Sequence, residues 1–286
     1  MPRVLIAGCG YVGATSARLF AEAGWEVIGW TRSKESAEQV SAGAISVAAM
    51  DISDLKNVRQ NSFDADVVVH CAGVAKRDPQ SYQQVYRDGV ANLVASFPRA
   101  RLIFTSSTSV YAQQDGSWVT EESPAEPLTE RGKILRQAES IVLDHGGIVL
   151  RVAGIYGPGR SFLLRSVINR TPLALVPDRF VNQVHRHDVA GAIFFLAEHE
   201  AMLAPRIFNV VDNLPVLRSE ILAWLSAELR IPLSSSEGIE EKRTDSNKRV
   251  SNAKLRGLGW APIYPNYIDA FTRSIFRQQA GPGHLI

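Results

Sequence analysis

Residues 4–13 read V-L-I-A-G-C-G-Y-V-G, and this stretch decides the fold of the chain. The four aliphatic residues Val4–Ala7 predict a short buried strand. In Tyr11–Ala23 the apolar residues recur with helical spacing, which predicts a helix that begins almost directly after the strand. The glycine pattern G-x-G-x-x-G joins the two segments, and in this strand–turn–helix context it predicts a dinucleotide-binding loop.

Each residue of this loop has an expected role. Gly8 permits the tight turn, Gly10 lets the backbone approach a pyrophosphate, and Gly13 lets the helix pack close to the strand. The free N–H groups of the first helical turn, where Tyr11 and Val12 lie, then face the anion. The alternative is a glycine turn whose only role is packing.

Strand-like and helix-like segments alternate through the rest of the first half of the chain. The expected strands are Glu26–Trp30, Val47–Met50, Ala65–His70, Arg101–Thr105 and Ile148–Val152, and the expected helices are Pro79–Phe97 and Glu130–His145. Near-continuous apolar strands that alternate with helices predict an α/β fold with a parallel sheet covered on both faces. We therefore expect a Rossmann-type doubly wound sheet.

The second half contains fewer strand-like segments and more chain breakers. Residues 1–153 are expected to form the dinucleotide-binding domain, and segments around 180–212, including a strand at Ile207–Val211, are expected to return to it. Residues 154–286 are expected to form a smaller, interleaved lobe on the substrate side. The helices expected in this half are Phe162–Arg170, Asp188–Glu198 and Arg218–Leu229.

The composition is that of an ordinary globular protein, with 45% hydrophobic and 21% charged residues among 286. Basic and acidic residues nearly balance, at 31 and 29, which argues against nucleic-acid or membrane binding driven by bulk charge. Two cysteines, Cys9 and Cys71, are too few for a disulfide framework or a zinc site, so we expect reduced thiols and no metal. The longest apolar stretches are far shorter than a membrane span, and we therefore expect a cytoplasmic protein.

The end of the second expected strand indicates which dinucleotide is bound. An acidic residue there would accept hydrogen bonds from the adenosine ribose and favour NAD. The residues present are Thr31, Arg32 and Ser33, with no carboxylate among them. Arg32 can pair with a 2′-phosphate and stack on the adenine, while the two hydroxyls add hydrogen bonds. We expect NADP to be preferred over NAD, the alternative being that Arg32 is only a surface cation.

Several further motifs occur in the order that is typical of one family. The segments are Met50–Ile52, His70–Gly73, Phe104–Tyr111, Arg151–Gly159, Val184–Ala190, Phe208–Val210 and Leu258–Trp260. In this order they resemble the extended and atypical short-chain dehydrogenases/reductases, the NAD-dependent epimerase/dehydratase family. The resemblance implies that Asp51 and the amide of Ile52 contact the adenine. It also implies that Cys71, Ala72 and Gly73 pass beneath the cofactor.

The same resemblance implies where the catalytic groups lie. Ser107 corresponds to the catalytic serine that faces the nicotinamide, and Ser106 beside it is expected to contact the cofactor; the alternative for Ser107 is a structural serine. The Tyr-x-x-x-Lys pair of the family falls at Thr129 and Lys133. Lys133 is expected to hold the nicotinamide ribose, but the threonine hydroxyl ionises far above the pKa of tyrosine and cannot act as the base near neutral pH.

Other side chains are candidates for the missing acid/base group. Tyr111 and Tyr156 follow strands that should end at the cofactor site, although packing roles are the alternative for both. Asp88 falls where the atypical subgroup can carry an aspartate, or else it is an exposed helix residue. His185 and His187 flank an arginine ahead of an expected helix, and one of them can face the cleft because histidine titrates near neutral pH.

Two functional hypotheses remain open. The first is an NADP-dependent oxidoreductase or epimerase that acts on a small-molecule substrate, such as a sugar or nucleotide sugar. Three arginines of the substrate lobe, Arg160, Arg170 and Arg186, would suit a phosphate or carboxylate if two of them converge. The second is a non-catalytic NADP-binding sensor, which the threonine at the tyrosine position favours. Related proteins pair two long helices across a dimer, so a homodimer is expected by analogy.

Overall fold

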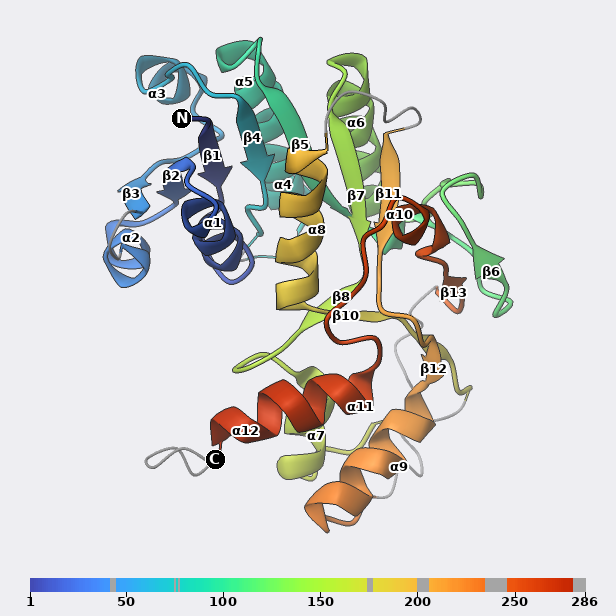
Figure 1. Cartoon of the computed structure of the whole chain (residues 1–286). Coiled ribbons are helices and arrows are strands. Elements are labelled where there is room, and N and C mark those ends of the chain that lie inside the picture. The colour runs from blue at the N-terminus through green and yellow to red at the C-terminus, as the bar shows by residue number, and fades with distance from the viewer. Residues whose placement is uncertain are drawn as a thin grey trace.

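A seven-stranded parallel sheet forms the centre of the molecule (Figure 1). The structure is a computed structural model, and it describes residues 1–41, 45–74, 76, 78–173, 177–199, 206–234 and 246–279. The strands are β1 (Arg3–Ala7), β2 (Glu26–Thr31), β3 (Ile45–Ala49), β4 (Val67–His70), β5 (Arg101–Ser107), β7 (Ile148–Val152) and β11 (Ile207–Val210). They lie in the order β11-β7-β5-β4-β1-β2-β3, and every neighbouring pair is parallel. The predicted Rossmann-type parallel sheet is therefore confirmed.

Helices cover both faces of this sheet, as its apolar strands require. On one face α1 (Gly13–Glu22) packs beside α8 (Arg186–Glu198), which is the front face in Figure 1. The other face carries α3 (Leu55–Gln60), α4 (Pro79–Tyr82), α5 (Gly89–Ser96) and α6 (Glu130–Asp144). A further helix, α2 (Lys34–Val40), lies against β2 and β3. Burial on both faces explains why strands such as β4 consist almost entirely of valine.

The helix predicted over Pro79–Phe97 is interrupted. A π-helical segment, η1 (Gln83–Asp88), lies between α4 and α5 and packs against α6. Segments of this kind are rare and occur often at functional sites. Tyr82 and Tyr86, from the end of α4 and from η1, both line the main cleft described below. The π-helical segment thus carries one of the two tyrosines that line the cleft.

Two helices of the first half were not predicted from the sequence. Both α2 and α3 are short, and each is preceded by a capping side chain. Ser33 accepts a hydrogen bond from the backbone N–H of Ser36, and Asp54 accepts one from Asn57. Such caps satisfy N–H groups that a helix start leaves free. Because both helices have fewer than eight residues, their apolar periodicity is too brief to stand out.

A second, smaller core lies beyond the carboxyl ends of the strands. Its buried residues come mainly from α7 (Phe162–Ile168), α9 (Arg218–Leu229), α11 (Tyr267–Ala270) and η3 (Phe271–Ile275), which continues into α12 (Phe276–Gln279). In Figure 1 these helices form the lower part of the molecule, and the central strands run towards them. Between the two cores the chain crosses repeatedly, since β11 joins the main sheet before α9 begins.

Short strand pairs connect the two cores. Parallel to β8 (Gly154–Tyr156) runs β10 (Gln183–His185), while β9 (Phe180–Val181) pairs with β12 (Val216–Leu217) in antiparallel fashion. At the edge of the main sheet, β6 (Trp118–Val119) pairs with β13 (Arg249–Val250), which precedes α10 (Ala253–Gly257). None of the helices in the described ranges is long and apolar enough to cross a membrane.

Candidate functional site

A cleft lies at the carboxyl ends of the central strands, where ligands bind in open parallel sheets. It consists of two adjoining chambers of about 520 and 390 Å³ that both reach the glycine loop at Gly8. The predicted site residues that line it are Gly8, Gly10, Tyr11, Val12, Thr31, Arg32, Ser33, Asp51, Ile52, Cys71, Ala72, Gly73, Ser106 and Ser107. Most of the predicted cofactor-binding residues are thus brought together.

The glycine loop has the close approaches that its pattern requires. Gly8 has a φ of +101°, and a Cβ there would lie 2.2 Å from the backbone nitrogen of Ala72. A Cβ on Gly13 would lie 2.3 Å from the carbonyl oxygen of Gly8, so the helix can pack this close only with glycine. Gly13 therefore has the predicted packing role rather than a place in the lining of the cleft.

Gly10 differs from the other two glycines because its surroundings are open. A Cβ at this position would meet nothing within 4 Å among the described residues, although Gly10 lines the cleft. The space above it is therefore available to a ligand that approaches the backbone. This geometry fits the pyrophosphate of a dinucleotide, which the pattern predicts at this point.

The smaller chamber extends from the glycine loop to the end of β2. Thr31, Arg32 and Ser33 line it together with Asp51 and Ser36. The side chain of Arg32 is exposed, whereas Thr31 donates its hydroxyl to the carbonyl of Ser33 at 3.0 Å. Ser36 lies next to Ser33, with the two hydroxyl oxygens 3.2 Å apart. Ser36 was not predicted as a site residue, and its place in the first turn of α2 was the available signal.

The floor of the cleft is formed by the segment that follows β4. Cys71 donates its thiol to the carbonyl of Gly8 at 3.3 Å, which ties this segment to the glycine loop. Burial raises the pKa of the Cys71 thiol, and it raises the pKa of Cys9 to about 11. Both thiols are therefore protonated at neutral pH, and both are free of disulfide bonds. These cysteines contribute packing rather than nucleophilic chemistry.

Ser107 lies at the end of β5 and lines the larger chamber. Its hydroxyl oxygen accepts a hydrogen bond from the backbone N–H of Ser109 at 3.1 Å, which caps the short 3-10 helix η2 (Thr108–Val110). The hydroxyl proton remains available to a ligand. Ser106 also lines the chamber, but its hydroxyl donates to the buried carboxylate of Glu139 at 2.7 Å.

Tyr111 does not reach the cleft, contrary to its prediction as a catalytic residue. Its side chain is 1% exposed, and its hydroxyl donates to Asn209 at 2.8 Å. The same oxygen accepts a hydrogen bond from Arg151 at 3.0 Å, and Arg151 forms an ion pair with Glu139 at 2.8 Å. Burial raises the pKa of Tyr111. The tyrosine belongs to a buried polar network that joins α6, β7 and β11.

The predicted positions of the Tyr-x-x-x-Lys pair also need correction. Thr129 is the N-cap of α6, where its hydroxyl oxygen accepts a hydrogen bond from the N–H of Gly132 at 3.1 Å. Lys133 is exposed and pairs with Glu130 at 2.6 Å. Neither Thr129 nor Lys133 lines the cleft in the described part of the chain. The capping role explains the threonine without any catalytic function.

The face of α6 that reaches the cleft carries the residues two positions after Thr129 and Lys133, namely Arg131 and Leu135. Leu135 lines the larger chamber. One turn earlier, the guanidinium carbon of Arg131 lies 5.8 Å from the ring centre of Tyr82, which lines the same chamber. Arg131 and Leu135 therefore have the four-residue spacing of the family pair, and both reach the larger chamber: Leu135 in its lining and Arg131 against Tyr82. The aromatic wall of this chamber, Tyr82 and Tyr86, was not predicted from the sequence.

The remaining acid/base candidates lie outside the cleft lining. Asp88 forms an ion pair with Arg87 at 2.9 Å. Tyr156 is 3% exposed, and its hydroxyl has no hydrogen-bond partner among the described residues. His185 is fully buried; its Nδ1 accepts from the N–H of His187, and burial lowers its pKa to about 3. A histidine that stays neutral to such a low pH does not titrate near neutrality.

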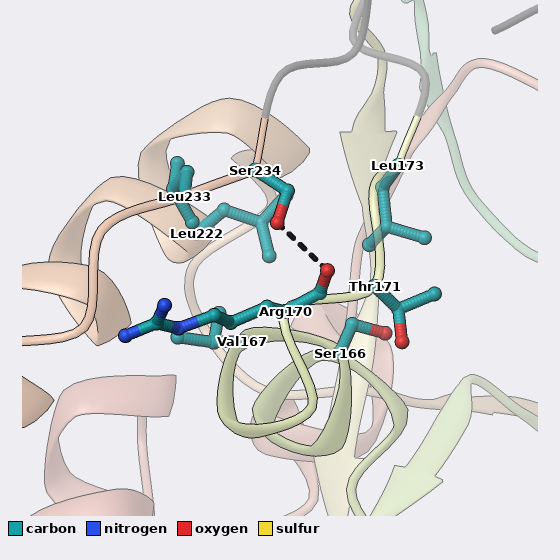
Figure 2. A pocket seen from close by; sticks show the side chains of 8 residues that line it. All are labelled: Ser166, Val167, Arg170, Thr171, Leu173, Leu222, Leu233 and Ser234. Atoms are coloured by element: carbon teal, nitrogen blue, oxygen red, sulfur yellow. Dashed lines mark hydrogen bonds between the residues drawn. The ribbon is translucent and has the colours of Figure 1, made fainter.

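Two of the three candidate arginines converge, and the third is remote. Arg160 and Arg186 both lie over the ring of Tyr11 in the glycine loop. Arg170 instead follows α7 and lines a small separate pocket beside α9 (Figure 2). There its carbonyl accepts a hydrogen bond from the hydroxyl of Ser234 at 2.7 Å. Arg170 therefore plays no part in the cleft.

Comparison with known proteins supports the same family that the motifs indicated. Residues 4–210 match the NAD dependent epimerase/dehydratase family. Protein YeeZ of Escherichia coli (strain K12) is 31% identical over 226 residues, which cover 73% of this chain and 77% of that protein.

Solved structures share the fold over almost the whole chain. A putative NAD-dependent epimerase/dehydratase from Methylobacillus flagellatus is 27% identical, with a TM-score of 0.78 over 97% of this chain and 99% of that one. A UDP-glucose 4-epimerase from Thermotoga maritima, solved with UDP-glucose, is 16% identical, with a TM-score of 0.82 over 97% and 99% of the two chains. The family match spans most of the sequence, and this chain belongs to the NAD dependent epimerase/dehydratase family.

Proposed function

We propose that this protein is an NADP-dependent oxidoreductase or epimerase that acts on a nucleotide sugar or a similar sugar substrate. The observation that carries the proposal is the continuity of the cleft. It runs from Arg32 at the end of β2, past the glycine loop, to Ser107 at the end of β5. A dinucleotide lying along this path would place its nicotinamide near Ser107 and its adenosine near Arg32.

The smaller chamber supports NADP rather than NAD. Arg32 brings an exposed guanidinium, and Ser33 and Ser36 bring hydroxyls to the same wall. These groups suit a 2′-phosphate, which is dianionic and accepts several hydrogen bonds. Asp51 is the carboxylate that lines this chamber, and its Oδ1 accepts hydrogen bonds from the N–H and hydroxyl of Ser53 at 2.9 and 2.7 Å.

The larger chamber supplies groups that can hold a substrate oxygen. When bound, the nicotinamide supplies a hydride acceptor or donor. Ser107 offers its hydroxyl proton from the end of β5, and Tyr82 offers a phenol from the end of α4, beside Arg131. We assign Ser107 to orienting the substrate hydroxyl or carbonyl, and Tyr82 to proton exchange with it.

A second candidate function rests on α6. On the face of α6 that reaches the cleft, Arg131 and Leu135 have the four-residue spacing of the family's tyrosine and lysine, and neither side chain can supply the usual proton path. A protein that only binds NADP and reports redox state to a partner would not need that path. A homodimer remains a prediction by analogy, and light scattering after size-exclusion chromatography tests it.

The deciding experiment combines binding and turnover. NADPH binding is measured by calorimetry, and turnover is followed by NADPH fluorescence with UDP-glucose and a panel of other nucleotide sugars. Tight NADPH binding together with turnover, lowered at least tenfold in Tyr82→Phe, supports the enzyme. Tight binding without turnover on any substrate favours the sensor, and absence of NADPH binding refutes both.

Engineered α6 variants separate a degenerate active site from a different one. Arg131→Tyr combined with Leu135→Lys places the family pair on the face that reaches the cleft. We expect this double variant to gain turnover if the site is a degenerate dehydrogenase. Thr129→Tyr is the matched control and should gain none, because position 129 caps the helix. Equal gains in both variants would refute the assigned register.

A further inference from the structure

Two arginines from distant parts of the chain converge on the glycine loop. Arg160, which follows β8, lines the larger chamber, and its guanidinium carbon lies 5.3 Å from the ring centre of Tyr11. Arg186 is the first residue of α8, and its guanidinium carbon lies 4.9 Å from the same ring. Both cations therefore lie close to the loop whose backbone amides face a phosphate group in dinucleotide-binding folds.

Backbone contacts fix the turn that carries Arg160. The N–H groups of Gly157 and Arg160 each donate to the other residue's carbonyl at 3.0 Å. The Tyr11 hydroxyl donates to the carbonyl of Pro158 at 3.1 Å, which ties the turn to the glycine loop. Gly157 has a φ of +150°, and a Cβ there would lie 2.8 Å from the Tyr11 hydroxyl oxygen. The arginine is thus presented by a preorganised turn.

Neither guanidinium is neutralised within the described chain. Salt bridges of the described residues include neither Arg160 nor Arg186. The Nε atom of Arg186 is buried and has no hydrogen-bond partner among the described residues. Asp188 lies two residues away, but its carboxylate accepts the N–H groups of Ile263 and Tyr264 instead. Two cations held together without a carboxylate call for an anion from outside the chain.

We propose that Arg160 and Arg186 form a diphosphate clamp over Tyr11, which binds the diphosphate of a nucleotide in the cleft. The proposal rests on the proposed function for the presence of such a nucleotide. The planar guanidinium group suits phosphate oxygens because it presents parallel N–H donors. The tyrosine ring contacts both guanidinium groups through cation–π interactions, and the Tyr11 side chain also forms a hydrogen bond with Arg186. The buried Nε of Arg186 remains without a partner among the described residues.

The helices beside the clamp add to its positive potential. α1 and α8 pack side by side; α1 begins two residues after Tyr11, and α8 begins at Arg186 itself. Each helix has at least ten residues, so its N-terminus carries a partial positive charge. A diphosphate placed between these helix starts and the two arginines is surrounded by donors on several sides.

The shared ligand chemistry has two sources in this cleft. One is the pyrophosphate that joins the two halves of NADP, and the other is the diphosphate of a nucleotide sugar. The test therefore measures three probes on Arg160→Gln and Arg186→Gln by titration calorimetry: inorganic pyrophosphate, NADPH, and UDP added to the NADPH-saturated protein. A fourth probe, 2′-AMP, occupies only the adenosine end. Arg170→Gln is the control, because Arg170 lies in the same lobe but lines a different pocket.

Each clamp variant should weaken inorganic pyrophosphate binding by about 10- to 100-fold, the usual effect of losing a hydrogen bond to a charged group. If NADPH weakens by a similar factor while 2′-AMP does not, the clamp holds the cofactor. If NADPH is unchanged while UDP weakens, the clamp holds the substrate. Unchanged binding of all the diphosphate probes, or an equal loss in Arg170→Gln, overturns the proposal.

Wild-type binding and a lysine variant separate the failure of the clamp from the failure of the proposed function. If wild-type protein binds neither NADPH nor 2′-AMP, the proposed function fails, whereas the pyrophosphate arm still decides the clamp. Arg186→Lys keeps the charge but not the planar fork, so we expect it to recover only part of the lost affinity. Near-UV circular dichroism and thermal melts check that each variant is folded. A variant that fails to fold is replaced in the comparison by its lysine counterpart.

Discussion

Replacing Asp188 with asparagine tests how burial has changed the ionisation of this carboxyl group. Asp188 lies in the first turn of α8 and is 1% exposed. Its two oxygens accept the backbone N–H groups of Ile263 and Tyr264 at 2.5 and 3.3 Å. Burial nevertheless raises its pKa from 3.8 to about 7, against the opposing effects of these hydrogen bonds and of Arg273.

A pKa raised from 3.8 to about 7 corresponds to about 4 kcal/mol of differential stability. The folded protein holds this proton more tightly than the unfolded chain does. The contribution is therefore fully present below the unfolded pKa and is lost as the pH rises through about 7. From Asp188 alone, the free energy of unfolding should fall by up to about 4 kcal/mol between about pH 4 and 7.5.

Other buried groups also change the free energy of unfolding over this pH range, so the comparison between two proteins is essential. Burial lowers the pKa of His185 to about 3, and the stability associated with this group is lost as the pH falls below 6.5. Burial raises the pKa of Asp212 well above its usual value, which acts in the same direction as Asp188. Because asparagine does not ionise, the difference between wild type and Asp188→Asn reports the contribution of Asp188 together with its coulombic effect on the Asp212 carboxyl, whose pKa the Asp188 charge raises.

The assay is urea unfolding of both proteins between pH 4.5 and 8, followed by tryptophan fluorescence. The Asp188→Asn variant is expected to become more stable relative to wild type as the pH rises, and the difference should level off above pH 7.5. Asp115→Asn is the control, because Asp115 is exposed and hydrogen bonds from Ser117 lower its pKa. A stability difference for Asp188→Asn that is flat, or that falls as pH rises, would refute the reasoning.

Three further changes give separate outcomes. Arg32→Ala should weaken NADPH by about 10- to 100-fold and leave NADH almost unchanged in calorimetry, since only NADPH carries the 2′-phosphate; equal losses would contradict the NADP preference. Glu139→Gln should lower the free energy of unfolding by about 3–5 kcal/mol in urea titrations, because Arg151 would stay buried without its counter-charge. Gly10→Val should leave the melting temperature within a few degrees yet abolish NADPH binding, because its side chain enters open cleft space. Gly8→Ala is the matched control for this last change. It should instead fail to fold stably, because the added Cβ would lie 2.2 Å from the backbone nitrogen of Ala72.

The half of the site that is built from backbone was predictable from the sequence. Gly8, Gly10 and Gly13 constrain the chain locally, and the flanking strand and helix are periodic enough to recognise. The same holds for the parallel sheet, whose strands are continuous apolar runs. The residues predicted to bind the cofactor follow directly from these elements because they occupy the strand ends.

The half that depends on side-chain direction was not predictable. Moving from Thr129 to Arg131 turns the side chain by about 200° around a helix, since successive residues differ by about 100°. The four-residue spacing of Thr129 and Lys133 matched the family pattern, but spacing alone does not say which face of α6 meets the cleft. The face of α6 that meets the cleft depends on where the helix begins, which is at Glu130. That start depends in turn on the capping hydrogen bond of Thr129, the residue predicted at the tyrosine position.

Long-range contacts explain the other corrections. Tyr111 lies near Ser107 in the chain, yet its hydroxyl is bonded to Asn209, which is 98 residues away. Arg160 and Arg186 likewise come together over the ring of Tyr11, which is far from both arginines in the sequence. Such partners become visible only when the strands have been placed in order.

The distribution of polar groups along the cleft bears on the choice between enzyme and sensor. A protein that only reports cofactor binding needs the glycine loop and Arg32, both of which lie in the first half of the chain. Here the cleft continues past the loop to Ser107 and Arg160, and the side chains of Tyr82 and Tyr86 also line it. Arg160 comes from the turn that follows β8 and adds a positive charge to the same chamber. A sensor that only binds NADP does not need groups for proton exchange. Ser107 and Tyr82 bring two hydroxyl groups to the same chamber, and this favours an enzyme whose proton donor lies outside α6.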